Sequence, residues 1–428
     1  MPEEFPEKLW DSLALIGGAV LVGMLTGLVG MAFLMLLELG NDRRIALTAA
    51  LRGWPVGTGL ALLALGTGAG ASFAAWLVKR FAPNAVGSGI PYAEKILRGP
   101  DQPNHAWVFP VKFFGGFLAL SAGMVLGREG PLVQIGAVIG ERVGRLFKKV
   151  EIWKPLMAAG AGVGVATAFN APVGGTLFIV EEVLRKVTPI GFVLAAAAAI
   201  SSAFIQRGVF GMGMDFRVAD VTAGPAANLG IYLVFGLALG GLGVFYNRLL
   251  LGLASPGNPL QKISSPVRAF GIGTVVGLVA WFLPNDAGGG DLLTQQVLQC
   301  YGSISLLLTI ALARFFLGPL SYAAGTPGGL FAPVVDLGAL LGAAAGFGLH
   351  EFSPALVPSP LAFAVAGMAG FFTASIRAPL TGIVICLEMT GCFDLFLPML
   401  AACTGAYLAA TLLRSEPIYD ALAKPVSS

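Results

Sequence analysis

Long, nearly uncharged hydrophobic stretches recur along the whole chain and limit the folds that it can adopt. About eleven of them approach or exceed the roughly 20 apolar residues that an α-helix needs to cross a bilayer. The clearest run through residues 12–37, 54–78, 155–180, 229–245 and 361–387. Charged residues make up only 11% of the chain, whereas a soluble domain carries about a quarter. The sequence therefore predicts an all-α membrane protein with many bilayer-spanning helices.

Other features of the composition argue against several classes of function. The first hydrophobic stretch is too long for a signal peptide and lacks a small-residue cleavage site, so we expect a retained helix. The net charge is only +3, which gives no support for nucleic-acid binding. The cysteines and histidines lack metal-ligand spacing, and no HExxH motif is present. We therefore expect no metal, no cofactor and no nucleic-acid partner.

Glycine is unusually frequent, at 60 of 428 residues, or about 14% against about 7% in an average protein. Close packing of membrane helices through small residues accounts for most of this excess. Glycines also gather with prolines inside apolar stretches, in VGSGIP at 86–91, GREGP at 127–131 and GTPGGLFAP at 325–333. Backbone breaks at membrane depth are tolerated only where they are buried in protein or line a cavity. These three breaks are therefore candidates for a binding site.

Two segments of the chain resemble each other at a constant offset of 207 residues. Residues 159–182 and 366–389 share an Ala-Pro dipeptide and a glutamate near their ends. We interpret them as parts of two homologous halves, residues 1–210 and 229–428, joined by a connecting segment at 211–228. An inverted-topology pair would bring the breaks of both halves to one site at the bilayer midplane, and we expect that arrangement.

Each break would begin a helix whose unpaired N–H groups and positive dipole end favour an anion. Ser88 adds a hydroxyl to the first break. Partial charges hold an ion weakly, which suits transport because the ion must leave again. A single motif of this kind could equally be a kink that binds nothing, but three in one chain favour an anion site.

Glu129 is the unusual residue of the second break. A carboxylate beside converging N–H groups would occupy the position of the anion itself. Protonation, which burial favours, would neutralise the carboxylate and release that position. The alternative is an ion pair with the adjacent Arg128, although successive residues at a helix start point in different directions. We therefore predict that Glu129 lies at the working centre of the protein.

Further polar residues are open to two interpretations. Glu181 and Glu182 end an apolar run just before Arg185, which is typical of an interfacial helix end with ion pairs between neighbouring turns. An acid at this depth is also a candidate for a proton relay. Tyr419 follows the last hydrophobic segment, as an ordinary interfacial tyrosine would.

Taken together, these motifs resemble the CLC family of chloride channels and proton-coupled chloride antiporters. The ordered set consists of GSGIP at 87–91, GREGP at 127–131 and GGLFAP at 328–333, with PVKFFGG at 110–116 between the first two. The similarity covers nearly the whole chain. It implies inverted halves built from tilted and discontinuous helices, and a homodimer with one ion path in each subunit.

The resemblance also implies roles for individual residues. Ser88 and Tyr419 would offer hydroxyls to a central anion, and the backbone N–H groups of Leu330 and Phe331 would complete its site. A further anion site would use the N–H groups around Gly127, Arg128 and Gly130. Glu129 would be the gating glutamate that exchanges with chloride and carries the proton. Glu182 would pass protons to the inner side.

Single positions refine the branch of the family. Ser88 favours chloride, since nitrate-preferring relatives tend to have proline there. Tyr92 stands where close bacterial relatives often have an acid. Only nine residues follow Tyr419, so we expect no cytoplasmic regulatory domain.

The sequence thus predicts a secondary active transporter that exchanges chloride for protons in a cell (inner) membrane, embedded in the lipid bilayer as a multi-pass homodimer. A passive chloride channel of the same family is the alternative. An intramembrane aspartyl protease is a third hypothesis, based on Asp291 in GGGD and on Asp420. It is disfavoured because Asp291 follows a polar loop and Asp420 lies beyond the last hydrophobic segment.

Overall fold

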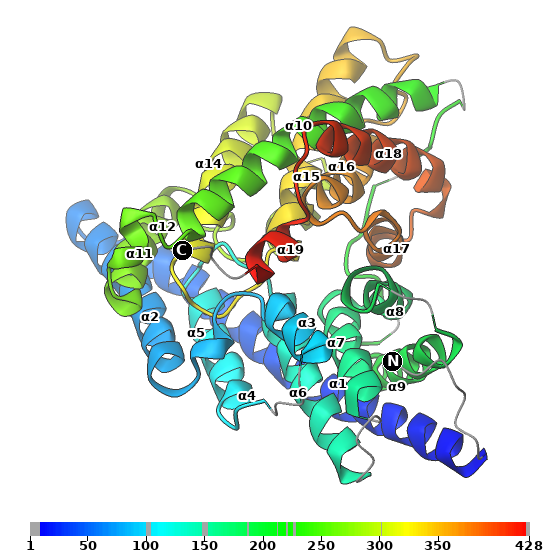
Figure 1. The fold of residues 1–428 in the computed structure, drawn as a ribbon. Coiled ribbons are helices and arrows are strands. Elements are labelled where there is room, and N and C mark those ends of the chain that lie inside the picture. The colour runs from blue at the N-terminus through cyan, green and yellow to red at the C-terminus, as the bar shows by residue number, and fades with distance from the viewer. Residues whose placement is uncertain are drawn as a thin grey trace.

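The computed structural model describes residues 9–99, 104–147, 153–185, 188–211, 213–219, 221–225, 228–300 and 302–424. Helices dominate these residues, and the only extended pairings within them are two isolated bridges between loops (Figure 1). The first half contains α1 (Leu9–Leu51), α2 (Val56–Phe81), α3 (Ile90–Arg98), α4 (Val108–Pro110), α5 (Gly116–Ser121), α6 (Glu129–Leu146), α7 (Trp153–Phe169), α8 (Pro172–Phe178) and α9 (Pro189–Phe210). The second half contains α10 (Leu229–Ala254), α11 (Pro259–Lys262), α12 (Ser265–Phe282), α13 (Asp291–Val297), α14 (Ile304–Ala323), α15 (Phe331–Phe352), α16 (Pro360–Ile376), α17 (Pro379–Thr390), α18 (Phe396–Leu412) and α19 (Ile418–Ala423).

The lengths and composition of these helices are those of a polytopic membrane protein. Within the described residues, eight helices are long and apolar enough to cross a bilayer, and three shorter apolar segments accompany them. The first predicted stretch, 12–37, is part of the 43-residue helix α1, which continues through a polar segment to Leu51. The predicted all-α, multi-pass fold class is confirmed.

Two of the predicted hydrophobic stretches are each broken into two helices at corresponding places. Asn170 and Arg377 adopt positive φ angles of 48° and 73°, and an Ala-Pro dipeptide follows each of them. Proline disfavours helical geometry in the preceding residue, and both alanines have a ψ of 76°. The prolines then begin α8 and α17 at positions where a missing N–H costs nothing. The shared Ala-Pro dipeptide therefore encodes the same helix break in both halves.

The two broken segments are joined by reciprocal carboxylate caps. Glu388, near the end of α17, accepts the N–H of Gly174 at 2.7 Å in the first turn of α8. Glu181, in the π-helical turn Ile179–Val183 that follows α8, accepts the N–H of Thr381 at 2.7 Å in the first turn of α17. The end of each helix therefore meets the start of the other, so α8 and α17 run antiparallel. They lie next to each other where the two halves meet (Figure 1). Equivalent helices running in opposite directions are what inverted topology requires.

Glycines allow the closest helix crossings within each half. A Cβ atom built on Gly136 of α6 would overlap the carbonyl oxygen of Gly160 on α7. The same is true of Gly338 on α15 and Gly367 on α16. Since these positions carry no side chain, the helix backbones touch, as the glycine excess predicted. α7 therefore holds α6 in place, and α16 holds α15. These contacts fix the starts of α6 and α15, which form part of the candidate site.

Candidate functional site

The three glycine-proline breaks predicted to form a site are hydrogen-bonded to one another. Gly127 and Gly329 exchange two backbone hydrogen bonds, with N···O distances of 2.8 and 2.7 Å. Gly87 donates to the carbonyl of Thr326 at 3.1 Å, and Gly328 donates back to the carbonyl of Gly87 at 3.0 Å. The break from the second half therefore lies between the two from the first half, and all three form one loop cluster.

A buried lysine supports this loop cluster. The Nζ atom of Lys112 is fully buried and donates to the Gly87 carbonyl at 2.6 Å. It is close enough to Glu129 for the two charges to interact. The role of Lys112 was missed in the sequence analysis, where it appeared only as part of PVKFFGG. In the sequence, Lys112 stands out as a lone cation inside the apolar segment Val108–Ser121. An ionisable residue in such a segment suggests a functional site.

The Glu129 carboxylate lies on the start of α15. The side chain is fully buried, and its Oε1 accepts the N–H of Phe331 at 2.7 Å. The N–H groups of Ala332 and of Glu129 itself also contact the carboxylate, while Oε2 has no hydrogen-bond partner. The carboxylate is thus held by backbone dipoles at a helix N-terminus, which is an environment that suits an anion.

Glycine makes room for the carboxylate on both sides. A Cβ atom built on Gly127 would overlap Glu129 Oε2, and one built on Gly329 would overlap Oε1. A Cβ on Gly130 would lie 2.6 Å from the backbone nitrogen of Gly329. The glycines of the second and third motifs are therefore required by the close approach of the carboxylate and of the two loops.

Arg128 points to a different set of partners. Its Nη2 lies 3.2 Å from Asp215 Oδ2 and 3.4 Å from Asp291 Oδ1. The adjacent Glu129 instead receives backbone N–H groups, so the two neighbouring side chains diverge as expected. Arg128 lines a cavity of about 560 Å³, the Arg128 cavity, together with Asp215, Asp291 and two further acids, Glu38 and Asp42.

Ser88 and Tyr419, the predicted sources of hydroxyl groups, are both fully buried. Ser88 lies between Gly87 and Gly89, whose φ angles of 62° and 78° require glycine. The hydroxyl of Tyr419 has no hydrogen-bond partner, and its ring centroid is 5.8 Å from that of Phe331. Of the two interpretations of Tyr419, its burial within the protein disfavours that of an ordinary interfacial tyrosine.

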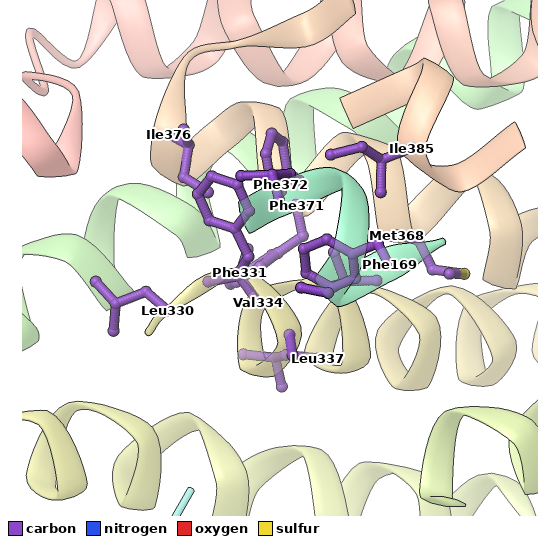
Figure 2. Packing of buried hydrophobic residues seen from close by; sticks show 14 of the residues in the cluster. Phe169, Leu330, Phe331, Val334, Leu337, Met368, Phe371, Phe372, Ile376 and Ile385 are labelled. Atoms are coloured by element: carbon purple, nitrogen blue, oxygen red, sulfur yellow. The ribbon is translucent and has the colours of Figure 1, made fainter. Parts of the chain in front are cut away.

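An aromatic cluster fixes the start of α15. Figure 2 shows Phe331 pointing into a group that includes Phe169 and Phe372, with Leu330 on the other side of the loop. The centroid of Phe331 is 4.8 Å from that of Phe372 in an edge-on arrangement and 6.2 Å from that of Phe169. Because the ring is anchored in this way, the Phe331 N–H keeps its direction toward Glu129.

A second group of acids lies around the predicted inner glutamate. Glu182 is buried on the π-helical turn after α8 and accepts from Arg185 at 3.4 Å, while Arg185 also pairs with Asp420 at 2.7 Å. Of the two neighbouring glutamates, Glu182 is the one that forms the ion pair with Arg185. Glu181 caps α17 instead. Glu182 and Glu129 both lie within electrostatic range of the Tyr419 hydroxyl.

Glu94 is a buried acid that the sequence analysis missed. It is 1% exposed, neither carboxylate oxygen has a hydrogen-bond partner, and Arg98 on the next turn lies 3.6 Å away. It interacts electrostatically with Glu182. In the sequence, Glu94 could have been noticed because it lies four residues before an arginine on the short helix after GSGIP. The same spacing is typical of an ordinary ion pair on a helix surface.

A second cavity, of about 720 Å³, reaches the GSGIP loop from another direction. Tyr92 and Tyr322 line it, with the three basic residues Lys95, Arg268 and Lys424. We call it the Tyr322 cavity. Its basic lining contrasts with the acidic lining of the Arg128 cavity.

The structure disfavours the protease hypothesis. Asp291 pairs with Arg128 and Asp420 with Arg185, so the two aspartates of the protease hypothesis are each bound to a different arginine. Among the residues that the structure describes, no group of three or more His, Cys, Asp or Glu side chains could hold a metal ion. What the site offers is a set of backbone N–H donors, the buried hydroxyls of Ser88 and Tyr419, and a carboxylate among them.

Comparisons with known proteins agree on one family. The profile described as voltage gated chloride channel matches residues 70–411. The H(+)/Cl(-) exchange transporter ClcA of Cronobacter sakazakii is 38% identical over 415 residues, covering 94% of this chain and 88% of that protein. ClcA of Yersinia pestis is 37% identical over 421 residues, covering 94% and 86%. The crystal structure of a slow cyanobacterial Cl-/H+ antiporter superposes with a TM-score of 0.90 at 31% identity, covering 96% of this chain and 97% of that one.

Proposed function

Because the chain belongs to the voltage-gated chloride channel family, a family of transport proteins and not of enzymes, we propose that it is a secondary active transporter that exchanges chloride for protons across the membrane. The observation that carries this proposal is the Glu129 carboxylate, buried on the N–H of Phe331 where an anion would bind. A group that competes with the anion and can also take up a proton links the two movements. The named activities of the ClcA relatives support the same conclusion.

In this proposal the anion path uses backbone dipoles and hydroxyls in place of a full positive charge. The central anion would receive the hydroxyls of Ser88 and Tyr419 and the N–H groups of Leu330 and Phe331. The Tyr419 hydroxyl has no hydrogen-bond partner in the protein and can therefore donate to an anion. A further anion site would use the N–H groups of Gly127, Arg128 and Gly130.

The proton path would run from Glu129 to Glu182. When Glu129 is protonated it loses its charge and yields its N–H donors to chloride, and when it loses the proton it returns to them. Glu182 would take the proton on the other side. The ion pair of Glu182 with Arg185 holds the acid in place without removing it from the buried region.

We also propose that the protein acts as a homodimer in an inner membrane, with one exchange path in each subunit and no cofactor. The resemblance to the family supports the dimer. The antiparallel pair of α8 and α17 offers an approximately symmetric surface, on which Val173 and Leu380 are 55% and 54% exposed.

A passive chloride channel is the second candidate, and coupled flux decides between the two. Liposomes that contain the purified protein and concentrated chloride should acidify inside as chloride leaves, even without a pH gradient, because each exchange brings protons inward. Recording external chloride and internal pH together measures both fluxes. Chloride efflux without acidification would establish the channel and contradict the exchanger.

Gly329→Ala tests the placement of the carboxylate. The new Cβ atom would overlap Glu129 Oε1 and lie 2.7 Å from the backbone nitrogen of Gly130, so the side chain must leave the Phe331 N–H and the two loops must move slightly apart. We expect proton flux to fall about tenfold or more, with much smaller loss of chloride flux, in the liposome assay described above. Gly348→Ala on α15 is the matched control, because a Cβ there meets no atom within 4 Å. Wild-type proton coupling in Gly329→Ala would show that the carboxylate does not need this position.

A further inference from the structure

Arg128 is held between two acids that come from different parts of the chain. Its Nη2 atom lies 3.2 Å from Asp215 Oδ2 and 3.4 Å from Asp291 Oδ1. Asp215 belongs to the segment between α9 and α10, and Asp291 is the first residue of α13. Only 21% of the arginine side chain is exposed, so water and salt screen these ion pairs less than they would at an open surface. The cation next to Glu129 in the chain is therefore committed to two carboxylates.

The backbone around Asp215 is fixed by contacts that do not involve the arginine. The N–H of Phe216 donates to the carbonyl of Met389 at 2.9 Å, and the Phe216 ring is buried. The side chain of Gln295 accepts the N–H of Arg217 at 2.9 Å and donates to the Arg217 carbonyl at 2.8 Å. These contacts tie the segment to α13 and α17. The Asp215 carboxylate therefore approaches the arginine from a position that the segment sets.

Asp291 is anchored separately, through the loop that precedes α13. Arg44 of α1 donates to the carbonyl of Ala287 at 3.2 Å. Gly288 donates to the carbonyl of Gly123 at 3.0 Å. These contacts hold the loop against the first half of the chain. Because the two acids are held by different contacts, loss of one carboxylate leaves the other in place beside Arg128.

The pairing matters because an arginine beside Glu129 could serve as its counter-ion. The charged or titratable groups within electrostatic range of Glu129 include Lys112, Arg128, Asp291 and Tyr419. The acids Glu38 and Asp42 on α1 also border the Arg128 cavity. An ion pair with a cation favours the ionised form of a carboxylate and opposes its protonation. In the structure, however, the Glu129 carboxylate rests on backbone N–H groups, and its Oε2 has no hydrogen-bond partner.

We propose that Asp215 and Asp291 are positioning residues that hold Arg128 away from Glu129, so that the gating carboxylate stays free to take up a proton. This inference rests on the proposed exchange of chloride for protons. The two acids act through the arginine and need touch neither ion. The segment between α9 and α10 thereby takes part in the exchange, in addition to linking the two helices.

Asp215→Asn tests this role when it is added to the Glu182→Gln variant. Chloride flux in that parent should rise as pH falls, because acid protonates Glu129 and frees its N–H donors. With one carboxylate removed, more of the Arg128 charge favours the ionised form of Glu129. We therefore expect the midpoint of the rise to move toward acid by about half a pH unit or more. Initial rates of chloride efflux from liposomes, recorded over a pH series, measure the midpoint.

Conservative and unrelated substitutions serve as controls in the same parent. Asp215→Glu keeps the carboxylate and should keep the midpoint of the parent. Asp394→Asn removes an exposed acid that forms no ion pair within the described residues, so it should also leave the midpoint unchanged. Asp291→Asn removes the other partner of Arg128 and should move the midpoint toward acid, as Asp215→Asn does.

A parent without the cation shows whether Asp215 acts through Arg128. Arg128→Gln alone should move the midpoint toward alkaline pH, because it removes a positive charge near Glu129. Adding Asp215→Asn should then move the midpoint much less than before, since no cation is left to hold. An equal shift with and without Arg128 would overturn the inference, as would an unchanged or more alkaline midpoint in Asp215→Asn. If chloride flux in the Glu182→Gln parent does not rise with acid, the proposed role of Glu129 fails, independently of Asp215.

Discussion

Replacing Glu129 by glutamine is expected to abolish proton movement while chloride continues to pass. Glutamine cannot take up a proton, and it has no charge with which to compete for the N–H of Phe331. Its amide group also offers only one acceptor atom, where the carboxylate offers two. Chloride should therefore occupy the α15 start without hindrance. We expect proton flux at the level of protein-free liposomes and a chloride flux that does not depend on pH.

The liposome recordings of chloride and internal pH test this result directly. Glu351→Gln serves as the control, because Glu351 is exposed at the end of α15 and should behave as the wild type does. Retained proton pumping in Glu129→Gln would remove Glu129 from the proton path. The proposal would then lose the residue on which it depends.

Glu182→Gln is expected to stop proton movement by a different route. The side chain is buried and its carboxylate is paired with Arg185, so glutamine keeps the shape but removes the exchangeable proton. Glu129 remains able to leave and return to the α15 start. Chloride flux should therefore persist at a substantial fraction of the wild-type rate, with proton flux reduced to background.

The pH dependence of chloride flux distinguishes the two variants. In Glu182→Gln, acid protonates Glu129 and frees its N–H donors, so chloride flux should rise as pH falls. In Glu129→Gln no such group is left, and the flux should stay level. Glu416→Gln is a control for the removal of an acid, because Glu416 is exposed and pairs only with Lys424 among the ion pairs described. Normal proton transport by Glu182→Gln would mean that this acid has a structural role.

Local chemistry explains why so much of the fold followed from the sequence. Hydrophobic length predicted the membrane-spanning helices. The Ala-Pro dipeptides were used only as a sign of the repeat, although they also explain the breaks after Asn170 and Arg377, since proline constrains the residue before it. The divergence of Arg128 and Glu129 also followed from local geometry. These features depend on residues that are neighbours in the chain.

The features that were missed depend on contacts between distant segments. Arg128 forms ion pairs with Asp215 and Asp291, which are 87 and 163 residues farther along the chain. In the sequence Glu94 resembles a surface residue, but in the folded chain it is buried. No pattern of spacing contains this information.

Glu181 and Glu182 show how one interpretation can hold for only one of two neighbours. The spacing of Glu181 to Arg185 is typical of an ion pair on one helix, and the adjacent Glu182 forms that pair. Glu181 instead caps α17, some 200 residues away. The repeat alignment had already paired Glu181 with Glu388, but only the structure reveals that each serves the opposite half.

These reciprocal caps have a consequence for biosynthesis. The ribosome completes α8 about 200 residues before it reaches α17, so the first half enters the membrane before its partner carboxylate exists. Until then, the N–H of Gly174 lacks the acceptor that Glu388 later provides, and Glu181 has no helix to cap. Unsatisfied polar groups are costly in lipid, so an isolated half should be short-lived. Insertion of α17 is therefore the step that commits both halves to their final arrangement.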